Sequence, residues 1–236
     1  MHRTSGIPTK KQFFDNFDNK EVEEFSNNFL KENRENLQTY STKWVKDPYS
    51  TWSRRWEYSY LLERIPKEQK KILDAGSGLT FLPALLKSRG HRVTCLDNDG
   101  ATIASAKDVG YAAICGDLTT NLEDKFDLVV CISVLEHLSN KKEVLKNFTN
   151  LLNDGGRLIL TYDICLSGDR DIPYTQINQL NSMIEEFFTP LELYNRDISN
   201  AITTNDFVSA GLSHLLPWKS HIPANFTFFC GYYEKK

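Results

Sequence analysis

The sequence predicts an α/β protein built on a mostly parallel sheet, and two observations lead to that prediction. From about residue 70 onward, short runs of β-branched and other apolar residues alternate with stretches of helical periodicity, a pattern typical of strands joined by crossover helices. The run over residues 126–132 is apolar on both faces, as a central strand must be when helices cover both sides of its sheet. We therefore expect one α/β domain over residues 70–236.

The predicted elements follow one another in regular order, and turn residues separate them. Strands are expected over residues 71–74, 92–96, 112–115, 126–132, 157–162 and 226–233. Helices are expected over residues 81–88, 102–108, 140–152, 175–188 and 204–210. Gly90, Gly110 and Gly211 follow three of these helices, at the position where a glycine commonly ends a helix. Residues 153–156 have the composition of a turn before the fifth strand.

Residues 1–69 are different, because they show no strand pattern and carry polar helical stretches. They also contain an aromatic cluster, which comprises Trp44, Tyr49, Trp52, Trp56, Tyr58 and Tyr60. We expect this segment to form an N-terminal helical cap on the sheet rather than an independent domain.

The composition argues against several classes of protein. The chain has 236 residues, a formal net charge of −3 and short basic runs, whereas nucleic-acid binding needs clustered Lys and Arg. No stretch is apolar enough to span a membrane, and the first residues lack the apolar core of a signal peptide. The five cysteines are widely spaced without a metal-ligand pattern. We expect small buried thiols, no metal ion and a cytoplasmic protein.

A glycine turn follows the first predicted strand. Gly76 and Gly78 come directly after Asp74, and a strand that stops at glycines lets a ligand approach the backbone near the free N–H groups of the next helix. The dinucleotide pattern G-x-G-x-x-G needs a third glycine, but Phe81 stands in its place. A nicotinamide or flavin dinucleotide is therefore disfavoured.

Acidic residues end three successive strands. Asp97 ends the second strand, where a carboxylate accepts hydrogen bonds from ribose hydroxyls, and Asp117 ends the third, where it can meet an adenine amino group. Asp74, at the first turn, can organise the loop or bind an ammonium group. Any one of these residues could simply be a cap or a turn residue. Together with the glycine turn, the three predict a nucleoside-binding site.

These segments resemble the class I S-adenosylmethionine-dependent methyltransferases over about residues 71–162. The resemblance rests on Ile-Leu-Asp-Ala-Gly-Ser-Gly at 72–78, Val-Thr-Cys-Leu-Asp at 93–97, Gly-Asp-Leu at 116–118 and the segment 126–138. Thr80 stands where the family's first motif often has a third glycine. The resemblance implies a Rossmann-like sheet of seven strands, mostly parallel, whose last strand, over residues 226–233, runs antiparallel.

The resemblance also implies roles for individual residues. S-adenosylmethionine would be the cofactor, with its methionine part near the glycine turn and Ser133, its ribose held at Asp97, and its adenine flanked by Asp117 and Leu118. The expected cofactor-binding residues are Asp74, Gly76, Gly78, Asp97, Asn98, Asp117, Leu118 and Ser133.

Several residues are candidates for binding or deprotonating the methyl acceptor or for closing over the site. His137 follows the fourth strand, and histidine is the side chain whose unperturbed pKa lies closest to neutral pH, which suits a catalytic base, although a structural role is the alternative. Tyr162 and Asp163, at the end of the fifth strand, would contact the acceptor or form a turn. Trp52 and Arg54 would close over the site, with Arg54 on the cofactor carboxylate, or belong to a helix that packs aromatic side chains on the sheet.

The predicted function is methyl transfer to oxygen or nitrogen of a small-molecule or sugar-like (glycan-like) acceptor, with no nucleic-acid or membrane partner. A nucleic-acid or protein methyltransferase is the alternative. The family's base-amino enzymes carry an Asn/Asp-Pro-Pro-aromatic loop after the fourth strand, whereas this chain has Ser-Val-Leu-Glu at 133–136. A non-catalytic S-adenosylmethionine-binding protein is a third possibility. The oligomeric state stays open.

Overall fold

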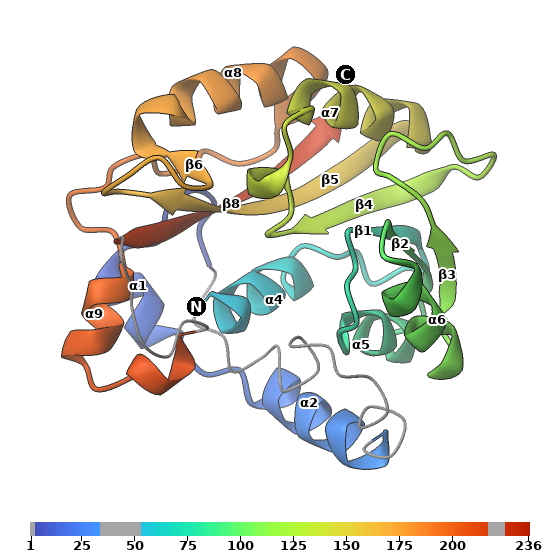
Figure 1. The fold of residues 1–236 in the computed structure, drawn as a ribbon, viewed down its shortest axis with the longest axis horizontal. Coiled ribbons are helices and arrows are strands. Elements are labelled where there is room, and N and C mark those ends of the chain that lie inside the picture. The colour runs from blue at the N-terminus through green and yellow to red at the C-terminus, as the bar shows by residue number, and fades with distance from the viewer. Residues whose placement is uncertain (1–2, 34–52, 217–224) are drawn as a thin grey trace.

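A computed structural model describes residues 3–33, 53–216 and 225–236. Its centre is one sheet with the strand order β3-β2-β1-β4-β5-β8-β7, and β6 pairs with β5 outside this path (Figure 1). The strands are β1 (Lys71–Ala75), β2 (Arg92–Asp97), β3 (Ala112–Cys115), β4 (Phe126–Ile132), β5 (Leu152–Cys165), β6 (Ile172–Pro173), β7 (Phe188–Pro190) and β8 (Phe226–Lys235).

The strand directions confirm the predicted architecture. β1, β2, β3, β4 and β5 pair in parallel, whereas β8 runs antiparallel to β5 and β7 antiparallel to β8. The expected sheet of seven strands with an antiparallel last strand is therefore present. The two-residue β6 and the three-residue β7 were not predicted, because a period of two cannot be recognised over so few residues.

The helices lie close to their predicted positions. They are α1 (Lys10–Asp15), α2 (Lys20–Glu32), α4 (Arg54–Leu62), α5 (Leu82–Ser88), α6 (Gly100–Asp108), α7 (Lys141–Leu151), α8 (Ile177–Phe187) and α9 (Thr204–Ser209), with short 3-10 helices η2 (Leu135–His137), η3 (Tyr174–Gln176) and η4 (Ser213–Leu215). The expected turn at 153–156 lies inside β5 instead. There Gly155, at φ 69°, and a register shift opposite β4 bend the strand without ending it.

Helices cover both faces of the sheet, as the composition of the central strand predicts. Leu128 and Val130 belong to a buried cluster shared with α4 and α5, and Val129 belongs to a second cluster shared with α7 and α8. Successive β4 side chains thus enter opposite layers, which Figure 1 shows as helices above and below the sheet.

The described part of residues 1–69 shares a core with the sheet. Trp56 and Tyr58 of α4 are buried in the same cluster as Val130. Nearer the N-terminus, the backbones of Gly6 and Cys230 exchange two hydrogen bonds of 2.6 and 3.1 Å, so the chain start lies beside β8. The boundary at residue 69 stays a prediction.

The sequence predicted no membrane-spanning segment, no metal site and buried cysteines, and the described residues can be compared with each prediction. None of their helices is long and apolar enough to cross a membrane, and their His, Cys, Asp and Glu side chains form no group of three or more suited to a metal ion. All five cysteines are free thiols, and four are buried. The expectation of burial is wrong for Cys115, because β3 is an edge strand.

Candidate active site at the carboxyl ends of the strands

The glycine turn after β1 has a backbone that requires glycine. Gly76 and Gly78 have φ of 73° and 53°, a region that side chains disfavour. A Cβ on Gly76 would lie 2.6 Å from a methyl group of Val134, whereas the nearest side-chain atom to a Cβ on Gly78 is 4.0 Å away. The turn therefore lies tight against the loop after β4 at Gly76 and stays open at Gly78.

Two carboxyl groups flank this turn. Asp97, at the end of β2, accepts the N–H of Gly78 at 2.9 Å and the N–H of Asp99 at 3.0 Å, so it holds both loops. Asp74 is 3 % exposed, and its Oδ2 lacks a hydrogen-bond partner among the described residues. Burial and the neighbouring Asp97 raise the pKa of Asp74 to about 7, against the opposing effect of Arg54. A buried, unpartnered oxygen of this kind suits a cationic ligand group.

The residues expected around the adenine are divided between surface and core. Asp117 is exposed and accepts both the N–H and the hydroxyl of Thr119 at 2.8 Å, which makes it a turn residue. Leu118 is buried, and its carbonyl accepts the side-chain amide of Asn147 at 2.8 Å. Asn98 is exposed after β2.

Helix α4 brings a buried ion pair to the end of β4. Arg54 pairs with Glu57 one turn later and donates to the Ser133 hydroxyl at 2.5 Å. Glu57 is fully buried and accepts hydroxyl hydrogen bonds from Ser133 at 2.8 Å and Thr161 at 2.6 Å. Burial opposes the charge on Arg54, but Glu57 keeps the pKa of that guanidinium above its usual value. Ser133 itself has a φ of 49°, so this network holds a strained residue in place.

A second acidic pair lies at the ends of β4 and β5. Glu136 of η2 is 4 % exposed and accepts the backbone N–H of Asp163 at 3.2 Å. Oε2 of Glu136 and Oδ1 of Asp163 are buried, and the described residues offer neither of them a hydrogen bond. Burial and Glu57 raise the pKa of Asp163 to about 8 despite Arg54, and burial and Asp163 raise that of Glu136.

The remaining predicted residues lie at the rim or elsewhere. The His137 side chain is 61 % exposed, with Nδ1 3.2 Å from a carboxylate oxygen of Asp171. Tyr162 does not join the group: it is fully buried, stacks on Phe229 and donates to Asn181 of α8 at 2.9 Å. Side chains alternate along a strand, so Tyr162 faces the layer opposite to that of Asp163. Trp52 lies outside the described residues.

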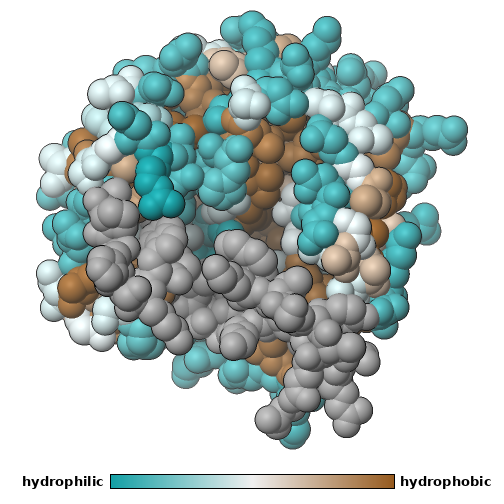
Figure 2. Space-filling view, in the orientation of Figure 1, coloured by the Kyte–Doolittle hydropathy of each residue, from teal (hydrophilic) through white to brown (hydrophobic). Residues whose placement is uncertain are grey.

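Sequence reasoning missed Glu57, Glu136 and Thr161 as members of the site. For Glu57 a signal existed, because it stands three residues after Arg54 and such residues are neighbours on a helix face. In Figure 2, apolar side chains line a recess near the centre of the face shown, over the region where the arrowhead of β4 lies in Figure 1.

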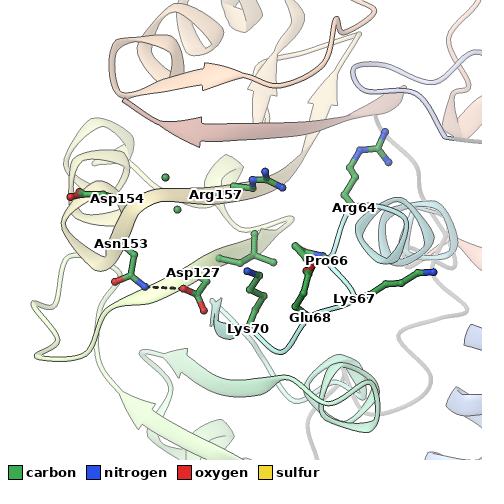
Figure 3. A pocket seen from close by; sticks show the side chains of 12 residues that line it. Arg64, Pro66, Lys67, Glu68, Lys70, Asp127, Asn153, Asp154 and Arg157 are labelled. Atoms are coloured by element: carbon green, nitrogen blue, oxygen red, sulfur yellow. Dashed lines mark hydrogen bonds between the residues drawn. The ribbon is translucent and has the colours of Figure 1, made fainter.

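A hollow of about 590 Å³ lies at the other end of the sheet, next to the starts of β1, β4 and β5 (Figure 3). Asp127, one of its charged side chains, accepts the Lys71 N–H at 2.8 Å and the Asn153 amide at 2.9 Å. Ligands of open α/β sheets bind at the carboxyl ends of the strands. We therefore assign the functional site to that end and not to this hollow.

Comparison with known proteins agrees with the fold and the first motifs. Residues 73–160 match the family described as Methyltransferase domain. A ubiquinone biosynthesis O-methyltransferase of Pseudomonas entomophila (strain L48) is 29 % identical over 112 residues, covering 44 % of this chain and 48 % of that protein. One of Coxiella burnetii (strain RSA 493 / Nine Mile phase I) is 27 % identical over 110 residues, covering 43 % of this chain and 47 % of that protein. The chain spans about half the length of these curated relatives.

Solved structures share the fold at low identity. A TehB-like S-adenosylmethionine-dependent methyltransferase of Corynebacterium glutamicum gives a TM-score of 0.52 at 21 % identity, over 89 % of this chain and 98 % of that one. The N-methyltransferase NodS of Bradyrhizobium japonicum WM9, solved with S-adenosyl-L-homocysteine, gives 0.55 at 13 % identity, over 87 % and 97 %. At such identities the likeness concerns the fold.

Proposed function

We infer, from the premise that residues 73–160 belong to the class I S-adenosylmethionine-dependent methyltransferase family, that this chain is an enzyme that methylates a small-molecule acceptor. The observation that carries the proposal is the assembly of Asp74, Gly76, Gly78 and Asp97 around one turn, with a buried oxygen of Asp74 unpartnered among the described residues. The premise covers part of the chain, so activity and acceptor are our proposals.

The described residues fit S-adenosylmethionine. The free oxygen of Asp74 suits the methionine ammonium group, and Arg54 suits its carboxylate. Asp97 keeps lone pairs for the ribose hydroxyls, and Leu118 offers an apolar contact to the adenine with Asp117 and Asn98 at its edge. The acid excess at this end also suits a cofactor whose sulfonium and ammonium groups outweigh its carboxylate.

When bound, S-adenosylmethionine supplies an activated methyl group, so the protein's main tasks are alignment and exclusion of water. Ser133, held by Glu57 and Arg54, fixes the loop that contacts the glycine turn. An acceptor hydroxyl or amine must also lose a proton. Asp163 is one proton acceptor at the site, and the exposed His137, beside Asp171, is the other.

Measurements of ligand binding and of methyl transfer separate this function from its alternatives. Calorimetry of the whole chain should show binding of S-adenosylmethionine and none of NADH, and the reverse result would overturn the proposal. Binding without methyl transfer to any acceptor would favour the non-catalytic alternative. Turnover on RNA or a peptide instead of small molecules would favour the macromolecular one. The free thiols among the described residues agree with a cytoplasmic location for the reaction.

His137 needs its own test, because its exposure fits either role. If it is the catalytic base, His137→Ala should lower kcat by about a hundredfold or more. Near-normal turnover would remove it from the mechanism and leave Asp163 as the proton acceptor.

A further inference from the structure

Two carboxyl groups at the ends of β4 and β5 are not needed to hold the nucleoside. They are Glu136, 4 % exposed, and Asp163, whose backbone N–H donates to Oε1 of Glu136. Each keeps one buried oxygen without a partner among the described residues, Oε2 of Glu136 and Oδ1 of Asp163. An unsatisfied buried carboxyl oxygen is costly, so two of them on residues joined by a hydrogen bond indicate a ligand group that donates hydrogen bonds.

The charge balance around Glu136 and Asp163 favours a positively charged ligand. Arg54 acts on both groups, but one of its terminal nitrogens is already paired with Glu57 and bound to Ser133, and the proposed function assigns the guanidinium to the cofactor carboxylate. Burial raises the pKa of Asp163 to about 8, with further contributions from Glu57 and Asp171. Burial and Asp163 likewise raise the pKa of Glu136. Negative charge is thus disfavoured at both carboxyl groups until a cation arrives.

We propose that Glu136 and Asp163 form the acceptor subsite and receive a protonated amine, so that the substrate class is amines rather than alcohols or phenols. The inference rests on the proposed function. An ammonium group carries three donors and no acceptor, and it satisfies the two free carboxyl oxygens and supplies the missing positive charge at once. A neutral hydroxyl supplies one donor and no charge.

The same two carboxyl groups also account for the proton that the bound ammonium group must lose before its nitrogen can be methylated. A bound ammonium R–NH₃⁺ gives one proton to the Asp163 carboxylate, which yields the neutral amine R–NH₂ and a carboxylic acid. The nitrogen lone pair is then free to take the methyl group. Proton transfer is most efficient when the base titrates near the operating pH, and the raised pKa of Asp163 brings it into that range.

The test compares amines with their hydroxyl analogues by calorimetry. The full chain is titrated with tyramine and tyrosol, and with glucosamine and glucose, each with and without saturating S-adenosyl-L-homocysteine. At least one amine should bind about tenfold or more tightly than its hydroxyl partner, which is the size of a charge-assisted hydrogen bond. Asp163→Asn and Glu136→Gln should each remove that preference, whereas Glu68→Gln, an exposed residue at the opposite end of the sheet, should retain it.

A second measurement uses only the wild-type chain, so it still tests the proposal if the variants fail to fold. Near neutral pH, amine binding to the wild-type chain should release close to one proton, because the cation ionises Asp163; titrations in two buffers of different ionisation enthalpy measure this. Equal affinity for amines and alcohols, a preference that survives both substitutions, or alcohol binding that appears with MgCl₂ would each overturn the inference. Absence of S-adenosyl-L-homocysteine binding would instead defeat the proposed function, since the amine titration without it is read independently.

Discussion

The two ends of the parallel strands differ in how their polar groups are satisfied. At the amino end, several of the charged side chains that line the hollow have partners, such as Asp127 with Asn153 and Asp154 with Lys235. At the carboxyl end, Asp74, Glu136 and Asp163 are buried with oxygens that the described residues leave unpartnered. We therefore expect a ligand at the carboxyl end, where its donors would satisfy these three carboxyl groups.

The gathering of three such carboxyl groups at the strand ends favours this end over the hollow as the ligand site. Leaving such atoms in the apo protein costs free energy, which a ligand with matching donors recovers on binding. The same difference predicts that equivalent substitutions at the two ends have unequal consequences, and the following comparisons test it.

The largest effect is expected for Glu57→Ala. Removing one member of a buried ion pair leaves the other uncompensated, at a cost of about 3–5 kcal/mol in the free energy of unfolding, and here it also leaves Ser133 and Thr161 without their acceptor. The matched control at the amino end, Glu68→Ala, should stay within about 0.5 kcal/mol of wild type. Urea denaturation measures both, and similar losses would contradict the proposed contrast.

Gly76 and Gly155 provide a matched pair with similar backbones, at φ of 73° and 69°. Alanine at either position adds about 1–2 kcal/mol of backbone strain. At Gly76 the new Cβ also meets Val134 at 2.6 Å, whereas at Gly155 no described atom lies within 4 Å. Overpacking should therefore cost Gly76→Ala roughly a further 1–3 kcal/mol. Thermal unfolding compares the two, and equal losses would show that Val134 simply moves aside.

Asp97→Ala tests the nucleoside site directly. Losing the ribose acceptor should weaken S-adenosylmethionine binding by about 1–3 kcal/mol. Asp154→Ala, at the exposed amino end, should leave the affinity unchanged. Calorimetry distinguishes them, and an unchanged Kd for Asp97→Ala would remove this residue from the site.

The smallest expected effect is a pH dependence of cofactor affinity. The pKa of Asp74 is raised to about 7, so the apo carboxyl group is protonated below that pH and must ionise to bind the methionine ammonium. Affinity should therefore rise by up to about tenfold from about pH 6 to about pH 7.5. Asp74→Asn should abolish the rise, and adenosine, which has no ammonium group, should show none with the wild-type chain. A persistent rise in either control would assign the titration to another group.

Local patterns predicted much of the fold. The bounds of β3 and β4 agree with the sequence because turn residues stand on either side of each strand, and β4 also has the burial that its apolar composition implies. The start of α7 at Lys141 is within one residue of the predicted start at residue 140, although the Asn140 side chain makes no cap hydrogen bond. The helix is held mainly by its buried apolar stripe, so its position does not depend on that bond.

The residues of the site also fall into two groups, those that local sequence predicts and those that tertiary contacts place. The sequence by itself determined the strand–glycine–helix turn with Asp74, Gly76, Gly78 and Asp97, because these residues act through backbone geometry and through partners at the next strand end. The tertiary structure alone decided the surroundings of Ser133 and Asp163. Glu57 reaches Ser133 and Thr161 across 76 and 104 residues of chain. Tyr162 and Asp163 lie on opposite faces of β5, and which face each one takes depends on packing against α4 and α8. The long-range partners of individual polar side chains leave no periodic trace in the sequence, and they set the charge and the unsatisfied oxygens of the acceptor subsite.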